Sequence, residues 1–167
     1  AAGVGVAEQS QALAGYLTQA LARKAAVCVQ WRLVAKSGLT SAQCLEHIAS
    51  GAPFEADVAV VVLGVNDVVD QVPSQRAIAA REAIANRLRN GHGVAHVVFA
   101  PLPPVQHFPG LPQPLRWIAG RDAKRHDDAV AAWASTRADV SHVPIDLPLN
   151  TALMADEVED KTITYLF

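Results

Sequence analysis

A polar tetrapeptide, Gly64-Val65-Asn66-Asp67, directly follows the apolar run of residues 58–63. Glycine at a strand end lets the backbone turn sharply, and an asparagine just beyond it can point an amide donor into a cleft. Such a donor stabilises the oxyanion that forms when a nucleophile attacks an ester carbonyl. Because Gly, Asn and Asp are also common in ordinary strand-to-helix turns, the tetrapeptide alone leaves both interpretations open.

The spacing of the six histidines in the sequence indicates no second functional site. No pair has the spacing of an HExxH motif, so we predict no metal ion. His96 falls within an apolar run and is expected to be a hydrogen-bonded core residue. His107 lies on a proline-rich loop, where it either contacts a ligand or is simply solvated. His92 and His142 are expected at the surface or at strand ends.

The composition indicates one folded domain with a real core. Of 167 residues, 51% are hydrophobic and 18% are charged, which leaves ample apolar surface to bury. The formal charge of -2 provides no broad basic field, so we predict no nucleic-acid partner. No apolar run approaches the length of a membrane span. Cys28 and Cys44 lack metal-ligand spacing, and we expect them to be buried free thiols.

The hydrophobic pattern alternates between strand and helix periods along the chain. Apolar and polar residues alternate over residues 27–34, which is typical of a half-exposed edge strand, whereas residues 58–63 suit a parallel strand buried on both faces. This order predicts a three-layer α/β/α sandwich with a parallel sheet and a flavodoxin-like plan. The other expected elements are helices at residues 8–23, 41–49, 73–90 (with Ser74 as N-cap) and 115–137 (broken or kinked near Gly120), strands at residues 94–100 and 140–145, and a proline-rich loop at residues 101–114.

Several segments, in order, resemble the blocks of the SGNH (GDSL-like) hydrolase family of ester hydrolases. The tetrapeptide matches the family's GxND block, in which Gly64 and Asp67 support the turn and Asn66 is the oxyanion asparagine. Ser37-Gly38-Leu39-Thr40 resembles the block whose glycine, here Gly38, offers its backbone N–H to the same oxyanion. Residues 1–6 are similar to the segment that directly follows the family's Gly-Asp-Ser, and residues 103–117 resemble a loop of a bacterial subgroup.

The resemblance implies a serine ester hydrolase that acts on a small ester and needs no cofactor. In this family a serine nucleophile is activated by a His-Asp pair, and the serine N–H, Gly38 and Asn66 would form the oxyanion hole. The family's sheet order is 2-1-3-4-5. Its first strand, which ends in the catalytic serine, would lie between residues 27–34 and residues 58–63.

The chain departs from the family at both ends. Gly-Asp-Ser is absent, and in the place of the family's Asp-x-x-His block Asp156 stands for the aspartate while Glu159 stands for the histidine. A glutamate, with a reference pKa of about 4.3, is too weak a base for this task. We therefore expect a single domain over residues 1–167, truncated at the N-terminus and altered after about residue 155, for which a shifted reading frame is one explanation.

These departures predict a chain that keeps the oxyanion donors but does not hydrolyse esters. The missing strand predicts poor folding, association with other chains through an exposed edge at residues 58–63, or filling of the gap by another segment, for which residues 162–167 are β-prone. The alternative function is a non-catalytic binding module on a flavodoxin-like sheet. The cytoplasm is the default compartment, and the oligomeric state is left open.

Overall fold

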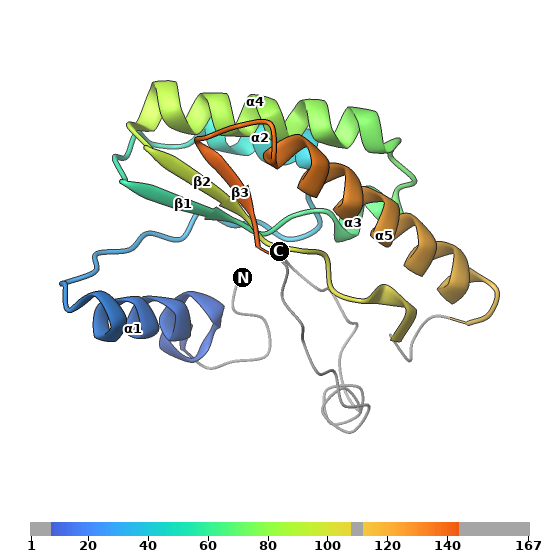
Figure 1. Ribbon diagram of the computed structural model, residues 1–167, viewed down its shortest axis with the longest axis horizontal. Coiled ribbons are helices and arrows are strands. Elements are labelled where there is room, and N and C mark those ends of the chain that lie inside the picture. The colour runs from blue at the N-terminus through green and yellow to red at the C-terminus, as the bar shows by residue number, and fades with distance from the viewer. Residues whose placement is uncertain (1–7, 108–111, 144–167) are drawn as a thin grey trace.

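The computed structural model describes residues 8–107 and 112–143, which form helices around a parallel sheet (Figure 1). The sheet has the order β1-β2-β3, and both pairings are parallel. The elements are η1 (Gln9–Gln11), α1 (Leu13–Ala25), α2 (Ser41–Ser50), β1 (Val58–Val61), α3 (Val65–Val69), α4 (Ser74–His92), β2 (His96–Phe99), η2 (Val105–His107), α5 (Leu115–Ala134) and β3 (Val140–His142).

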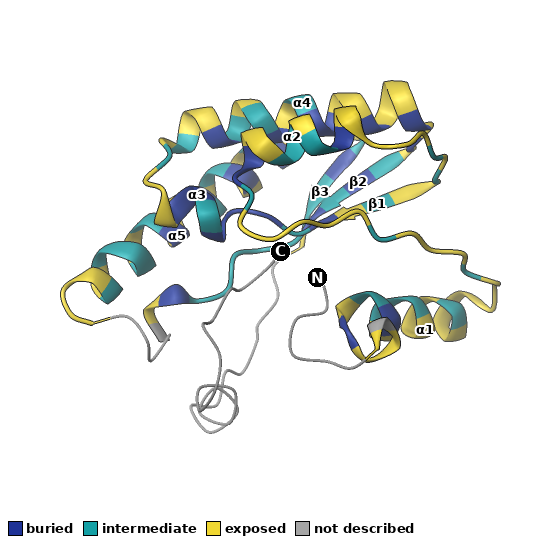
Figure 2. Ribbon diagram, turned by 180° about the vertical axis from the view of Figure 1, so that it is seen from behind, coloured by how far each residue is buried: buried dark blue, intermediate teal, exposed yellow. Residues whose placement is uncertain are grey.

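The helices lie on both sides of the sheet. Helices α2, α4 and α5 cover one face, and α1 lies on the opposite side, where it packs against η1 (Figures 1 and 2). The fold is therefore a three-layer α/β/α arrangement, as the alternation of strands and helices predicted.

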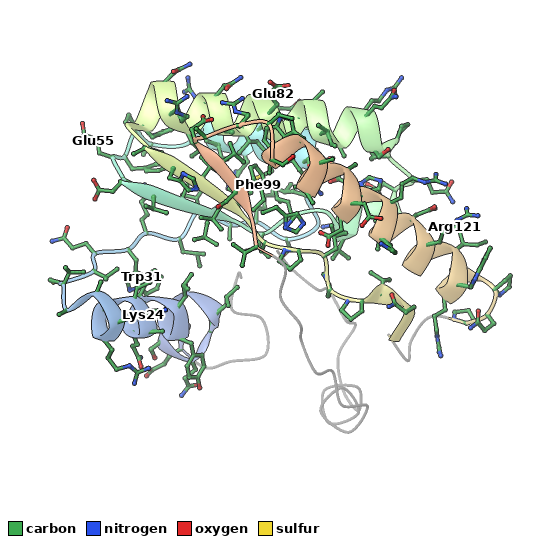
Figure 3. The ribbon with its side chains drawn as sticks, in the orientation of Figure 1. Lys24, Trp31, Glu55, Glu82, Phe99 and Arg121 are labelled. Carbon is green, nitrogen blue, oxygen red and sulfur yellow. The ribbon has the colours of Figure 1, made fainter. Side chains whose placement is uncertain are left out.

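The main core lies between the sheet and the covering helices. Val97 and Phe99 of β2 belong to one buried cluster with Ile84 and Leu88 of α4 and Val130 of α5. Figure 3 shows the side chain of Phe99 between the sheet and the helices. Strand β2 alternates between buried and half-buried residues. Because successive side chains of a strand point to opposite faces, this alternation shows that only one face of β2 is fully covered.

Strand β1 is more exposed than its apolar sequence indicates. Val58 and Val60 are 55% and 43% exposed, whereas Val61 is buried. The prediction that this strand is buried on both faces is therefore wrong. Among the described residues, β2 is the sole strand that pairs with β1, and the side chains of Val58 and Val60 stay exposed.

Residues 27–34 do not form the predicted strand. Val27, Trp31 and Val34 are exposed, and the described part of the chain offers them no neighbouring strand. A strand forms only where a partner satisfies its backbone N–H and C=O groups. The alternating pattern at this place therefore lacks the hydrogen-bonding partner that would convert it into a strand.

Three smaller expectations are also corrected. Helix α5 runs unbroken through Gly120, where a Cβ atom would lie 2.7 Å from the Cβ of Gln106, so this glycine permits close packing rather than a break. Pro73, not Ser74, is the N-cap of α4. Cys28 is exposed, although both cysteines are free as expected.

No helix of the described residues is long and apolar enough to cross a membrane.

Candidate active site

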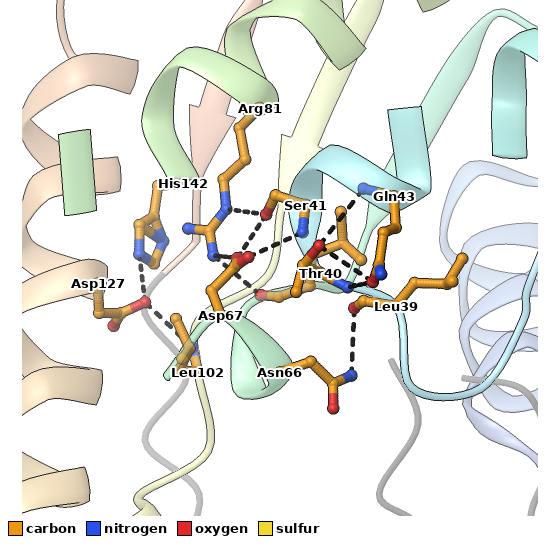
Figure 4. Close-up of polar contacts among 11 residues, drawn as sticks. Leu39, Thr40, Ser41, Gln43, Asn66, Asp67, Arg81, Leu102, Asp127 and His142 are labelled. Atoms are coloured by element: carbon orange, nitrogen blue, oxygen red, sulfur yellow. Dashed lines mark hydrogen bonds and ion pairs between the residues drawn. The ribbon is translucent and has the colours of Figure 1, made fainter. Parts of the chain in front are cut away.

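The two loops that carry the proposed oxyanion donors meet beyond the carboxyl end of β1 (Figure 4). The Nδ2 atom of Asn66, in the first turn of α3, donates a hydrogen bond of 3.1 Å to the carbonyl oxygen of Leu39, which follows Gly38. One amide hydrogen of Asn66 is used in this bond and orients the amide, while the second makes no hydrogen bond to a described residue. The structure therefore brings together the two blocks that the sequence placed 28 residues apart.

Gly38 adopts a conformation that favours glycine. Its φ angle is +75°, in the left-handed region, and a Cβ atom at this position would meet nothing within 4 Å. The requirement for glycine is therefore conformational rather than steric. Its backbone N–H, in the exposed turn before α2, donates no backbone hydrogen bond within the described residues.

Asp67 joins the same two loops from inside the molecule. It is 1% exposed, and its Oδ1 accepts the backbone N–H of Ser41 at 2.8 Å. Its Oδ2 accepts the Ser41 hydroxyl at 2.5 Å. Because Ser41 opens α2, the carboxylate also lies at a helix N-terminus, where a negative charge is favourable. Asp67 therefore does more than support a turn.

Arg81 of α4 completes this buried cluster and was missed in the sequence. It is 2% exposed, its Nη2 lies 3.3 Å from Oδ2 of Asp67, and its Nε donates to Oγ of Ser41 at 3.2 Å. Burial lowers the pKa of its guanidinium, and the neighbouring Asp67 carboxylate opposes that shift. The available signal was its position on the apolar face of α4, between Ala77 and Ile84, where an unpaired charge would be costly.

The arginine also explains why residue 64 is glycine. Gly64 has a φ angle of +126°, and a Cβ atom there would collide with Nη2 of Arg81 and lie 3.0 Å from Cδ1 of Leu102. Both the backbone conformation and the close approach of a buried guanidinium exclude a side chain at this position.

A histidine–carboxylate pair lies at the end of β3, at the same edge of the sheet. Nε2 of His142 is 2.9 Å from Oδ1 of Asp127, which also accepts the backbone N–H of Leu102 at 3.0 Å. His142 is the last residue of β3, which confirms the expectation of a strand end, and its side chain is only 5% exposed. The geometry is that of a base with its orienting acid, yet no described serine hydrogen-bonds to this histidine.

Two other histidines, His92 and His96, lie away from these loops. His92 is buried and stacks on Phe54 at 3.9 Å between ring centroids, which corrects its expected surface position. His96 is half-buried and hydrogen-bonds through Nε2 to Oγ of Ser141 at 3.0 Å, which confirms that it is hydrogen-bonded. This Ser–His contact runs between β2 and β3, within the sheet rather than beyond its carboxyl edge.

All seven serines of the sequence are described, and none combines with a histidine and a carboxylate in the described structure. Asp156 and Glu159, together with the segments at residues 1–6 and 162–167, lie outside the described residues, as does the side chain of His107. Within residues 8–107 and 112–143, no three His, Cys, Asp or Glu side chains are grouped to hold a metal ion.

The three-layer fold, with its polar loops at the carboxyl edge of the sheet, is that of the SGNH-type α/β/α hydrolases. A model of the GDSL-like lipase/acylhydrolase family matches residues 1–163, and the chain belongs to this family. No curated protein matches the chain.

Two solved structures resemble this one. A serine-to-alanine mutant of the esterase AlinE4 matches with a TM-score of 0.64 and 20% identity, over 93% of this chain and 76% of the other. A platelet activating factor structure from Streptococcus pneumonia matches with a TM-score of 0.53 and 22% identity. That match covers 64% of this chain and spans half, 50%, of the other. At these identities the likeness extends to the fold alone.

Proposed function

We propose that this chain carries the oxyanion-binding half of a serine ester hydrolase site, formed by the backbone N–H of Gly38 and the side-chain amide of Asn66. The observation that supports the proposal is the 3.1 Å hydrogen bond from the side chain of Asn66 to the carbonyl oxygen of Leu39, the residue after Gly38. Family membership and the fold shared with an esterase support a small ester as the substrate class.

In the proposed reaction, a serine oxygen attacks the ester carbonyl and the carbonyl oxygen becomes an oxyanion. Donors fixed in advance around that position lower the barrier because they need no reorganisation when charge develops. The hydrogen bond to Leu39 holds the Asn66 amide in place, so its second N–H is directed without further loss of side-chain freedom. Asp156 is the proposed orienting acid of the catalytic histidine.

We further propose that the chain as given does not turn over esters. This proposal is supported by the absence, among the described residues, of a serine that hydrogen-bonds to a histidine paired with a carboxylate. Loss of the nucleophile or the base leaves the modest residual catalysis of oxyanion stabilisation and binding alone.

The test is hydrolysis of p-nitrophenyl acetate and butyrate by the purified protein. The expected result is at most a low residual turnover that a fluorophosphonate serine reagent does not reduce. Enzyme-dependent turnover that a fluorophosphonate serine reagent blocks would contradict inactivity, and peptide mapping of the labelled serine would then identify the nucleophile.

The competing function is a non-catalytic binding module. The two proposals differ at Gly38 and Asn66, because only the hydrolase site requires both donors to bind one oxyanion. Binding of a tetrahedral oxyanion at these two residues therefore favours the hydrolase site, and its absence favours the module.

A further inference from the structure

The guanidinium of Arg81 lies where the two donor-carrying loops meet (Figure 4). Its Nε atom donates to Oγ of Ser41 at 3.2 Å, and its Nη2 atom lies 3.3 Å from Oδ2 of Asp67. Ser41 comes three residues after Gly38, and Asp67 directly follows Asn66. One side chain from α4 therefore contacts the loop of each proposed oxyanion donor.

A third contact of Arg81 holds the backbone at Leu63, two residues after the end of β1. Nη2 of Arg81 also donates to the carbonyl oxygen of Leu63 at 3.4 Å, one residue before the turn at Gly64. A guanidinium is planar and rigid, so several hydrogen bonds from one group define a single relative arrangement of their acceptors. A lysine supplies the same charge without this fixed fork.

We infer that Arg81 is a positioning residue, whose contacts with Ser41, Asp67 and Leu63 set the distance and orientation between the N–H of Gly38 and the amide of Asn66. This inference rests on the proposed function, because it assigns Arg81 a role only if those two donors bind a common oxyanion. Arg81 is 2% exposed, so it offers almost no surface to a substrate and would act through the groups that it holds.

The alternative is that Arg81 serves stability alone. A buried ion pair is a poor source of stability, because removing both charges from water offsets most of their attraction, and apolar residues of similar volume do as well. Within the described residues, the side-chain hydrogen bonds of Arg81 go to the two donor loops and to the carbonyl oxygen of Leu63, and none goes to α5 or to β2. This distribution fits alignment of the loops better than support of the core.

The test uses the folded chain as it is and a small tetrahedral oxyanion, dimethylarsinate, as the probe. The probe is titrated while the backbone N–H signal of Gly38 and the side-chain amide signals of Asn66 are followed by 15N–1H NMR. The unmodified protein should bind the probe saturably, and Asn66→Ala should abolish that binding. Arg81→Lys should weaken it by about 10–100-fold, as loss of a supporting contact typically does.

A matched control separates positioning from stability. Leu88→Ala removes a buried side chain two turns further along α4, in the main core and away from both loops. It should lower the melting temperature yet leave the affinity for dimethylarsinate within about twofold, because the donor geometry is untouched. If Arg81→Lys does not fold, Asp67→Asn replaces it, since this variant keeps the shape and removes the charge that orients the guanidinium.

The outcomes distinguish the two proposals. Failure of the unmodified protein to bind at Gly38 and Asn66 would overturn the proposed function and this inference with it. Binding by the unmodified protein that persists undiminished in folded Arg81→Lys or Asp67→Asn would overturn the positioning role alone. Equal weakening in Leu88→Ala would likewise assign Arg81 to stability and reject the inference.

Discussion

Asp67 and Arg81 form a buried ion pair in which Oδ2 and Nη2 lie 3.3 Å apart and the side chains are 1% and 2% exposed. Neither charge reaches water, so each depends on the other and on Ser41 for its hydrogen bonds. The pair therefore links the α2 loop, the α3 turn and α4 into one unit, and disturbing one member should affect all three.

Removing the carboxylate of this pair should be costly. Asp67→Ala leaves the guanidinium of Arg81 buried without its counter-charge, and breaking a buried pair in this way typically destabilises a protein by about 3–5 kcal/mol. Urea unfolding followed by circular dichroism measures the loss. Asp128→Ala is the control, because its ion pair with Lys124 is exposed and should contribute at most about 1 kcal/mol. Similar losses for the two variants would contradict the role of burial.

Alanine at position 64 should destabilise the protein more than alanine at position 93. Both glycines have positive φ angles, so both variants suffer left-handed strain of about 1–2 kcal/mol. A Cβ atom at Gly93 meets nothing within 4 Å, whereas one at Gly64 collides with Arg81. Overpacking should add about 1–3 kcal/mol to Gly64→Ala. Equal unfolding free energies for the two variants would show that Arg81 moves aside freely.

Much of the fold follows from local pattern. Helix α4 was predictable because Ala77, Ile84 and Leu88 recur at helical spacing, and Gly93 ends it in a left-handed conformation. Strand β2 followed from its apolar run. By contrast, residues 27–34 have the alternation of a strand but no described partner, and pairing is a property of the sheet rather than of the segment.

The site was predictable only where residue type carries the chemistry. Asn66 became a candidate because an asparagine after a strand suggests an amide donor, whereas Gly38 became one only through the resemblance of residues 37–40 to a family block. The roles of both residues stay predictions. Arg81 could not be assigned a role in this way, because its partners lie 40 and 14 residues away in the sequence. The pairing of His142 with Asp127 could not be predicted for the same reason, because helix α5 and strand β3 come together only in the folded chain.

The uncovered edge of β1 should make the protein self-associate. Val58 and Val60 expose apolar surface beside backbone groups that no described strand pairs, and such an edge adds strands from other chains. Val60→Lys places a charge on this edge and should increase the monomer fraction in size-exclusion chromatography with light scattering. Val69→Lys on α3, which is 67% exposed, is the control and should leave association unchanged. A protein that is monomeric and melts cooperatively without substitution would exclude association through this edge.

The stability of the fold should fall as the pH drops below the normal range of histidine titration, and His126 should be one cause. His126 lies on α5 with 5% of its surface exposed, and burial and, to a lesser degree, the charge of Arg81 lower its pKa. Histidines of the unfolded chain titrate near about 6.5. Just below that pH, residue 126 therefore binds a proton in the unfolded chain but not in the folded chain. Stability from this group is fully present above that pH and is lost as the pH falls towards the lowered pKa, with a slope of at most about 1.4 kcal/mol per pH unit.

Urea unfolding of His126→Gln between pH 7.5 and 5 measures this contribution against the unmodified protein. The variant should be less stable at pH 7.5, because a core side chain is changed, but its stability should depend less steeply on pH. Leu88→Ala controls for the change of a buried core side chain and should retain the original slope, because leucine does not titrate. If His126→Gln keeps the full slope, the pH dependence does not arise from the buried imidazole of α5.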